Sequence, residues 1–266
     1  MTHDWRVTDL SALADRLRKT KRHKKLVGLI ARAAAAGTIR EDLLEAERCL
    51  EEIERIQAGR NQSEAEVDAR EVTITGALFS HAVVLYGRAT FTSSEERRGL
   101  LGEDHLTVPL RAAHRAIKKL RNSGIAHYGR AEHLPDGPLV REAVVYIFWR
   151  TDGHVRDQVN VLSTRAQHKV RVQRQLKGLV RAQLDHLALS QQDYLTAVRE
   201  ELEIAMKADS DLGRMLPTLP FDPYAFCASP EAALKLAVNL QRGELGNHSY
   251  AVGIPDAVAD GSGSPA

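Results

Sequence analysis

The stretch VDAREVTITGALFSHAVVLYGRATF, residues 67–91, decides how the rest of the chain is interpreted. Nearly all of its residues are apolar or small, and the run is far longer than a typical strand of about 5–6 residues. Apolar residues also lie on most sides of any helix drawn through it, which is typical of a helix surrounded by protein. We therefore expect a buried central helix and a mainly α fold.

The segment that follows, residues 106–120, predicts a second helix with two distinct stripes. Apolar residues recur at spacings of four and three and form a stripe that should pack inward, namely Leu106, Leu110, Ala113, Ile117 and Leu120. Polar residues at i, i+4 and i+7 form an adjoining stripe, consisting of His114, Lys118 and Arg121. This helix thus combines a core-facing side with an edge suited to function.

Two helices are expected before the central one. The first is LVGLIARAAAAG, residues 26–37, with Gly37 as its C-terminal cap. The second is REDLLEAERCLEEIERI, residues 40–56, whose apolar positions recur at helical spacing. The polar segment 58–66 is the predicted junction to the central helix.

Residues 141–163 predict a β-hairpin, because β-branched and aromatic residues flank a turn at Asp152-Gly153. A two-stranded hairpin is marginal alone, so we expect it to lie against the helices, with Tyr146, Phe148 and Trp149 competing for the buried face. One long helix over about 166–206 should follow, with any bend at Gly178 or Ser190.

The length and composition indicate a globular chain with one domain of ordinary size and additions. We divide it into an N-terminal helical region (1–60), a helical domain with the hairpin (61–208) and a loosely structured tail (209–266). No apolar run reaches the roughly 20 residues of a membrane span, and the first residues lack a secretory pattern. We expect a cytoplasmic protein without membrane contact, whose two cysteines, Cys49 and Cys227, are reduced thiols.

The net charge of +2 does not by itself indicate a nucleic-acid partner, but the charge is unevenly distributed. Residues 16–25, RLRKTKRHKK, contain seven Lys or Arg. They are either an ordinary solvated surface, which is the simpler interpretation, or a contact for phosphates.

The motifs of metal and nucleotide chemistry are missing from the sequence. It has no His-Glu-x-x-His, no paired-cysteine motif, no calcium loop and no Gly-rich phosphate loop. We therefore predict no metal and no cofactor.

Two strings resemble the HEPN superfamily, small all-α domains that act on nucleic acids. LRAAHRAIKKLRNSGIAH, residues 110–127, is similar to the segment in which Arg, a polar residue and a later His close the third main helix of these domains. VVLYGRATFTSSEERRGL, residues 83–100, looks like the preceding helix. The resemblance covers about residues 66–130 and implies an antiparallel HEPN-type bundle.

The resemblance also implies an activity, metal-independent RNA cleavage that leaves a 2′,3′-cyclic phosphate and a 5′-hydroxyl. His127 titrates near neutral pH and suits the proton transfers, while Arg121 keeps its charge and suits a phosphorane. Asn122 would orient the histidine or a phosphate oxygen through its amide. Arg121, Asn122 and His127 are therefore the predicted catalytic residues.

The spacing of the catalytic pair adds a geometric condition. On an unbroken α-helix, six steps place positions 121 and 127 about 120° apart around the axis and about 9 Å apart along it. Either the helix bends or ends near Gly124, or two copies of the motif complete the site across a homodimer, as is usual in HEPN ribonucleases. We expect a two-fold homodimer with the motif at its interface. From the resemblance we also expect a role in a toxin or phage-defence system, with an antitoxin protein as a partner.

Further residues are assigned by position. His114 and Lys118 are predicted RNA contacts, and Arg88 is either a third contact or an arginine paired with a carboxylate, whereas His81 is expected at the edge of the core. Two alternatives to an enzyme stay open. One is a HEPN-type module that binds RNA or protein without cleavage, and the other is a helical scaffold in which RNSGIAH only ends a helix.

Overall fold

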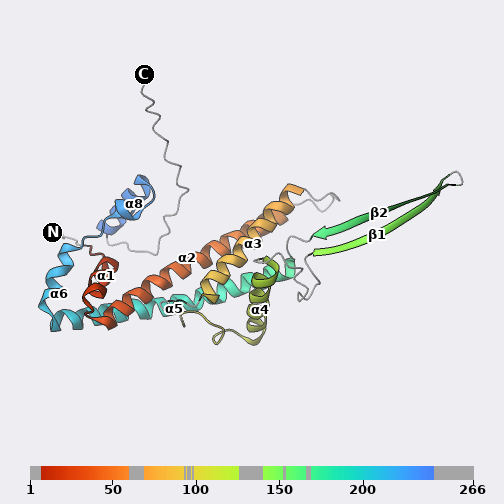
Figure 1. Cartoon of the computed structure of the whole chain (residues 1–266). Coiled ribbons are helices and arrows are strands. Elements are labelled where there is room, and N and C mark those ends of the chain that lie inside the picture. The colour runs from red at the N-terminus through yellow and green to blue at the C-terminus, as the bar shows by residue number, and fades with distance from the viewer. Residues whose placement is uncertain are drawn as a thin grey trace, which may run out of the picture. The chain divides into compact units, whose positions relative to one another are not determined.

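The structure is a computed structural model that describes residues 7–59, 69–92, 94, 97, 99–125, 140–151, 154–165 and 169–242 (Figure 1). It divides into two compact units, a central unit, Arg32–Leu195, and a terminal unit, Met1–Ala31 with Thr196–Ala266. The regular elements of the described residues are helices, apart from one two-stranded sheet and an isolated bridge, Thr8 with Pro220. The prediction of a mainly α fold with one small hairpin is confirmed.

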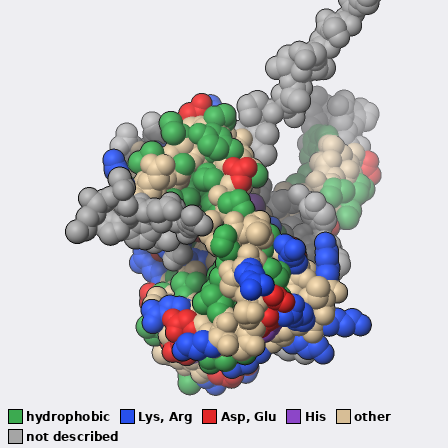
Figure 2. All heavy atoms as spheres, turned by 90° about the vertical axis from the view of Figure 1, so that its left-hand side faces the viewer, with side chains coloured by type: hydrophobic (Ala, Val, Ile, Leu, Met, Phe, Trp, Pro, Cys, Tyr) green, Lys and Arg blue, Asp and Glu red, His purple; other side chains and the backbone are tan. Residues whose placement is uncertain are grey.

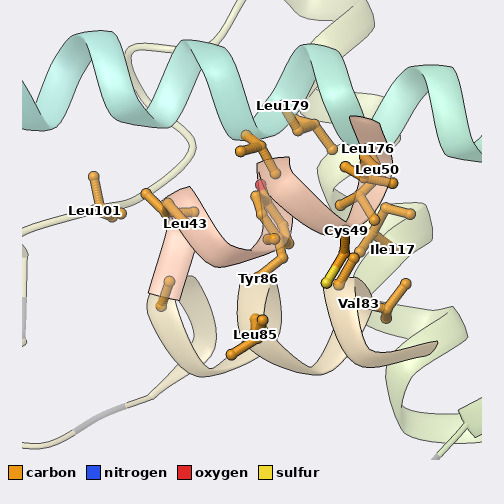
Figure 3. Close-up of a cluster of buried hydrophobic side chains, with 14 of the residues drawn as sticks. Leu43, Cys49, Leu50, Val83, Leu85, Tyr86, Leu101, Ile117, Leu176 and Leu179 are labelled. Carbon is orange, nitrogen blue, oxygen red and sulfur yellow. The ribbon is translucent and has the colours of Figure 1, made fainter. Parts of the chain in front are cut away.

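The core of the central unit is built by four helices, α2 (Lys24–Ala58), α3 (Ala69–Phe91), α4 (Val108–Lys119) and α5 (Val170–Ala208). Figure 3 shows Tyr86 and Val83 of α3 among leucines from α2 and α5, with Ile117 of α4 beside them. Each large apolar side chain that is fully buried contributes about 1.5–3 kcal/mol. The predicted central helix is confirmed as α3.

The predicted apolar stripe of α4 faces this core. Leu106, Ala113, Ile117 and Leu120 are each at most 5% exposed, and Leu110 packs against the same cluster as a half-buried residue. The spacing of four and three thus gave the orientation of the helix correctly. As a result, the adjoining polar stripe lies at the edge of the core, where it can contact α3.

The predicted helix end at Gly37 is wrong. α2 runs without interruption from Lys24 to Ala58, so the two expected N-terminal helices are one. A glycine inside a helix costs about 0.5–1 kcal/mol relative to alanine, but Ala36, Ile39 and Leu43 around it are completely buried. Packing on both sides of Gly37 outweighs that local cost.

The hairpin forms as predicted, but its aromatic face is not buried. β1 (Val140–Thr151) pairs antiparallel with β2 (His154–Arg165). Tyr146 and Phe148 are 61% and 71% exposed, and Trp149 is 40% exposed. The expectation that these side chains lie against the helices is therefore wrong, because no described helix covers either face of the ribbon.

The long helix predicted over 166–206 is confirmed as α5, which continues through Gly178 and Ser190 without a break. Leu176, Val180 and Leu187 of this helix are completely buried. Among the described residues, no helix has the combination of length and apolar character that crossing a membrane requires.

The terminal unit contains α1 (Leu10–Thr20), α6 (Ser210–Met215), the 3-10 turn η2 (Leu216–Thr218), α7 (Pro223–Phe226) and α8 (Pro230–Gln241). Asp9 caps α1 by accepting hydrogen bonds from the backbone of Ser11 and Ala12. Residues 209–242 were expected to be loosely structured apart from one short helical run at 229–242, SPEAALKLAVNLQR. That run is α8, and the segment before it also forms short helices, with buried side chains such as Leu212. Residues 243–266 lie outside the described part of the chain.

The basic run 16–25 lies on α1 and the start of α2, where several of its charges are neutralised. Arg22 and His23 both contact Asp209, and Lys25 pairs with Glu201. Figure 2 shows the corresponding face, on which blue Lys and Arg side chains stand among red acidic ones. Such pairing is typical of an ordinary solvated surface, the simpler of the two interpretations.

Candidate functional site

The α-helical pattern of α4 ends at Lys119, and the chain continues as a π-helical segment, η1 (Leu120–Ile125). In a π turn, backbone hydrogen bonds join residues five apart instead of four. Such turns are rare overall, but those that occur are often found at functional sites. Asn122 and Gly124 are weak helix formers, which favours a departure from α geometry. Leu120 is fully buried and anchors the turn in the core.

This π turn coincides with the predicted catalytic motif. The expected angle of about 120° between Arg121 and His127 assumed an unbroken α-helix, and that assumption fails at Leu120. His127 itself lies outside the described residues. The structure therefore places Arg121 and Asn122, and the third predicted catalytic residue stays a prediction.

Arg121 lies along the surface of α3. If Gly87 carried a Cβ atom, that atom would lie 3.3 Å from Cγ and 3.4 Å from Nε of Arg121, which is close contact. The guanidinium Nη1 donates a hydrogen bond to Oδ1 of Asn122 at 3.1 Å. Asn122 thus contacts the arginine, and Gly87 provides room for the arginine side chain. The catalytic roles predicted for Arg121 and Asn122 stay predictions.

His114, one turn before Lys118 on the same stripe, is buried against α3. Its Nδ1 forms a 2.7 Å hydrogen bond with the hydroxyl of Tyr86, and its ring lies 4.9 Å from that of Phe91. Burial lowers the pKa of His114, and the nearby charges of Glu103 and Lys118 act in opposite directions with smaller effects. The imidazole is therefore mainly neutral at pH 7 and only 7% exposed, so a structural role is better supported than a charged RNA contact.

Lys118 completes the stripe with an exposed cation. Its Nζ lies 5.5 Å from the centre of the Phe91 ring, within the range of a cation–π contact. Together with Arg121 over Gly87, this places both cations of the stripe on the end of α3. His114, Lys118 and Arg121 therefore lie next to one another against α3, as their spacing predicted.

An open pocket of about 450 Å³ lies between the end of α3, the connection to α4 and α4 itself. The side chains that matter for its charge and shape are Phe91, Arg97, Glu103, His114, Arg115 and Lys118. Two of the three predicted RNA contacts, His114 and Lys118, thus share one pocket. Arg88 is not among its lining residues.

The charges of this pocket are largely compensated. Arg115 donates two hydrogen bonds to Glu103, at 2.9 and 2.6 Å, which lower the pKa of that carboxyl. Arg97 lies 3.9 Å from Asp42 and donates a hydrogen bond to the carbonyl of Arg88. Of the three pocket cations within the described residues, Lys118 is the one without a carboxylate partner.

Arg88 is paired with a carboxylate, which was one of its two predicted roles. Its Nε and Nη2 atoms donate to the two carboxylate oxygens of Asp42 on α2, with a distance of 2.8 Å from Nε to Oδ2. Asp42 is 5% exposed, so the arginine neutralises a buried charge. This is a structural task, and it directs the guanidinium toward α2.

A stacked histidine pair lies close to the same region. The rings of His105 and His186 are 3.8 Å apart and nearly parallel. Burial lowers the pKa of His105, and the neighbouring charge of His186 lowers it further. The neutral form of His105 is therefore favoured, which suits packing of the α3–α4 connection against α5.

Three charged residues of the pocket were not predicted from the sequence, namely Arg97, Glu103 and Arg115. A signal existed for Arg115, because Arg111, Arg115 and Lys118 recur at i, i+4 and i+7 and so share one side of a helix. No comparable signal marks Arg97, which is brought to the pocket by the connection after α3.

Comparisons of the chain with protein-family models, with curated proteins and with solved structures found no match.

Proposed function

We propose that this chain is a metal-independent endoribonuclease of the kind that the HEPN resemblance implies, with Arg121 and His127 as its principal residues. One observation carries the proposal. Arg121 lies over Gly87 and donates a hydrogen bond to Asn122 within a π turn, one turn beyond Lys118, which lines the open pocket. A fixed charge placed by a rare backbone geometry, one turn from a residue of that pocket, supports a site for a phosphate.

The proposed reaction needs proton transfer and charge stabilisation. A histidine takes the proton of an RNA 2′-hydroxyl, whose oxygen attacks the adjacent phosphorus. Negative charge grows on the phosphorane oxygens, where the guanidinium of Arg121 stabilises it through two N–H donors. The bond to the 5′-oxygen then breaks, and that oxygen leaves with a proton. His127 is the group proposed for the proton transfers.

The pocket has a separate role in this proposal. Lys118 is exposed and has no carboxylate partner among the residues that the structure describes, and it would hold a phosphate next to the one that is cleaved. Phe91, which lines the pocket under the lysine, offers an aromatic surface beside it. We expect removal of Lys118 to weaken RNA binding more than it slows cleavage of bound RNA.

A homodimer is part of the proposal. Two protons move in the reaction, and a second copy of the motif would supply a second histidine. We expect the full chain to have the mass of a dimer in light scattering, and a monomer at the concentration of the cleavage assay would contradict this part of the proposal.

A non-catalytic RNA-binding module is the second candidate. It is favoured by the hydrogen bond from Arg121 to Asn122, which occupies one donor of the guanidinium that cleavage would use. In that case the full chain would bind RNA through Lys118 and leave it intact.

The test is incubation of the full chain with mixed RNA in EDTA, followed by analysis of product ends. Wild type should release fragments with 2′,3′-cyclic phosphates. Arg121→Ala should lower the rate on the order of 10²–10³-fold, as loss of one charge-stabilising donor does, and His127→Ala on the order of 10²–10⁴-fold. RNA binding is measured in parallel by fluorescence anisotropy.

A matched control is Arg199→Ala, because Arg199 is a strongly exposed arginine of α5. It should cleave like wild type. Cleavage that persists in both Arg121→Ala and His127→Ala would reject the enzyme proposal, as would intact RNA with wild type. Binding without cleavage would establish the second candidate.

A further inference from the structure

Three side chains from α2 and α3 meet at a place that the proposed RNA site does not use. Glu45 and Cys49 are four residues apart on α2, so they lie on the same side of that helix, and His81 comes from α3. One ligand atom of each, a carboxylate oxygen, the thiol sulfur and an imidazole nitrogen, all lie within 4.8 Å of one another. Figure 3 shows the Cys49 sulfur on the side of α2 that faces α3.

This grouping has the chemistry of a zinc site. Zinc bonds of about 2.0–2.3 Å in tetrahedral geometry require ligand atoms about 3.3–3.8 Å apart, so small side-chain rotations would bring the three atoms into range. A thiolate and an imidazole select zinc-like ions over magnesium or calcium. Three protein ligands leave a fourth position for water, toward the side on which His81 is exposed.

We propose that Glu45, Cys49 and His81 bind one Zn²⁺ ion that links α2 to α3. The site lies within the central unit and is independent of the RNA-cleavage proposal. The proposal also differs from the expectation of no metal, which was based on the lack of short metal-binding motifs in the sequence. Such motifs could not include this site, because its third ligand lies on another helix.

The surroundings of Cys49 define how the ion binds. Burial raises the pKa of this thiol, and the charge of Glu45 raises it further, while Arg48 lowers it. Binding replaces the thiol proton with a sulfur–zinc bond and releases that proton to solvent.

Glu45 can reach the ion despite its ion pair. Both contacts from Arg48, one from Nε and one from Nη2, fall on the same carboxylate oxygen, Oε2. Both side chains of the pair are about half exposed, and exposed pairs of this kind are weak. The other oxygen, Oε1, has no contact from Arg48.

The experiment uses the full chain, reduced and freed of metal, titrated with Co²⁺ and then Zn²⁺. Co²⁺ bound to a thiolate produces a charge-transfer absorption that histidine or carboxylate ligands alone do not produce. The chain has two cysteines, so the absorption reports on Cys49 or Cys227. Cys227→Ser is therefore the matched control for Cys49→Ser, and His81→Ala removes an exposed ligand with little risk to folding.

The expected result is one Co²⁺ per chain with thiolate absorption, displaced by Zn²⁺ and kept in Cys227→Ser. The absorption should be lost in Cys49→Ser, and affinity should fall at least about tenfold in His81→Ala and Glu45→Gln. Zn²⁺ should also raise the melting temperature of wild type. The proposal is overturned if wild type gives no thiolate absorption, if Cys227→Ser abolishes it, or if His81→Ala binds as tightly as wild type. None of these readouts involves RNA, so the result stands whether or not cleavage is found.

Discussion

α3 and the hairpin are both rich in apolar residues, yet one is buried and the other is not. In α3, Phe79 and Tyr86 are at most 1% exposed, whereas in β1 Tyr146 and Phe148 are mostly exposed. The hydrophobic effect acts through area removed from water and not through composition. An apolar pattern therefore predicts the type of an element, but burial depends on which partner reaches it.

The largest expected effect comes from matched phenylalanines in the two regions. Phe79→Ala should lower the free energy of unfolding by about 3–5 kcal/mol, because it leaves a cavity in the core. Phe148→Ala should change it by less than about 0.5 kcal/mol, as is usual for exposed positions. Urea denaturation measures both. A large loss from Phe148→Ala would mean that a second copy or another partner covers the hairpin in solution.

A smaller effect is expected for the polar contact at the edge of the core. Tyr86→Phe removes the hydroxyl that bonds to Nδ1 of His114 and leaves a buried ring nitrogen without this partner. The cost should be about 1–3 kcal/mol in urea denaturation. Tyr146→Phe is the control in the hairpin, where the hydroxyl contacts Asp157 in water, and it should be close to neutral. Equal losses of unfolding free energy in Tyr86→Phe and Tyr146→Phe would contradict the difference proposed between the buried core edge and the exposed hairpin.

The pH dependence of stability offers a further test of the buried edge. Burial lowers the pKa of His114 below the ordinary value of 6.5, so the unfolded chain binds the proton more tightly than the folded one. Its contribution is therefore fully present above about pH 6.5 and is lost as pH falls through the lower folded pKa. His114→Gln should show less loss of stability between about pH 7 and pH 5 than wild type. An identical loss in both would show that His114 is not the group involved.

The smallest effect on stability is expected at Gly87. Gly87→Ala gains up to about 1 kcal/mol of helix propensity, offset by the displacement of the Arg121 side chain that lies against it. Thermal melting should therefore change little, whereas RNA cleavage should fall. Gly28→Ala on α2, where an added Cβ meets no atom within 4 Å, is the control that should leave cleavage unchanged. Full activity in Gly87→Ala would show that this position of Arg121 is not needed.

Much of the helical fold could be predicted from periodicity. The apolar stripe of α4 and the central position of α3 followed from spacing alone, because both helices pack against partners along their length. The uninterrupted α2 could not be predicted at Gly37, since its continuity depends on distant helices that bury Ala36 and Ile39. The predicted burial of the hairpin was wrong for a related reason. Burial of its aromatic side chains also depends on distant helices, and none of the described helices covers them.

The candidate site was predictable in part. The stripe of positions 114, 118 and 121 is a property of one helix and could be recognised in the sequence. The π turn could not, because Asn122 and Gly124 indicate only that α geometry weakens there, not what replaces it. The pairs of Arg88 with Asp42 and of Arg97 with Asp42 join residues that are far apart in the chain, so no local pattern reveals them.

The buried carboxylate of Asp42 has a consequence for how the molecule responds to ionic strength. Asp42 takes up charge from Arg88 and Arg97, and Glu103 takes up that of Arg115. Among the described residues, Lys118 is therefore the pocket cation without a carboxylate partner. Each phosphate neutralised on a single strand contributes a slope of about −0.7 to the logarithmic dependence of affinity on salt. If RNA binds at this pocket as proposed, the pocket should contribute a salt dependence close to that of a single phosphate.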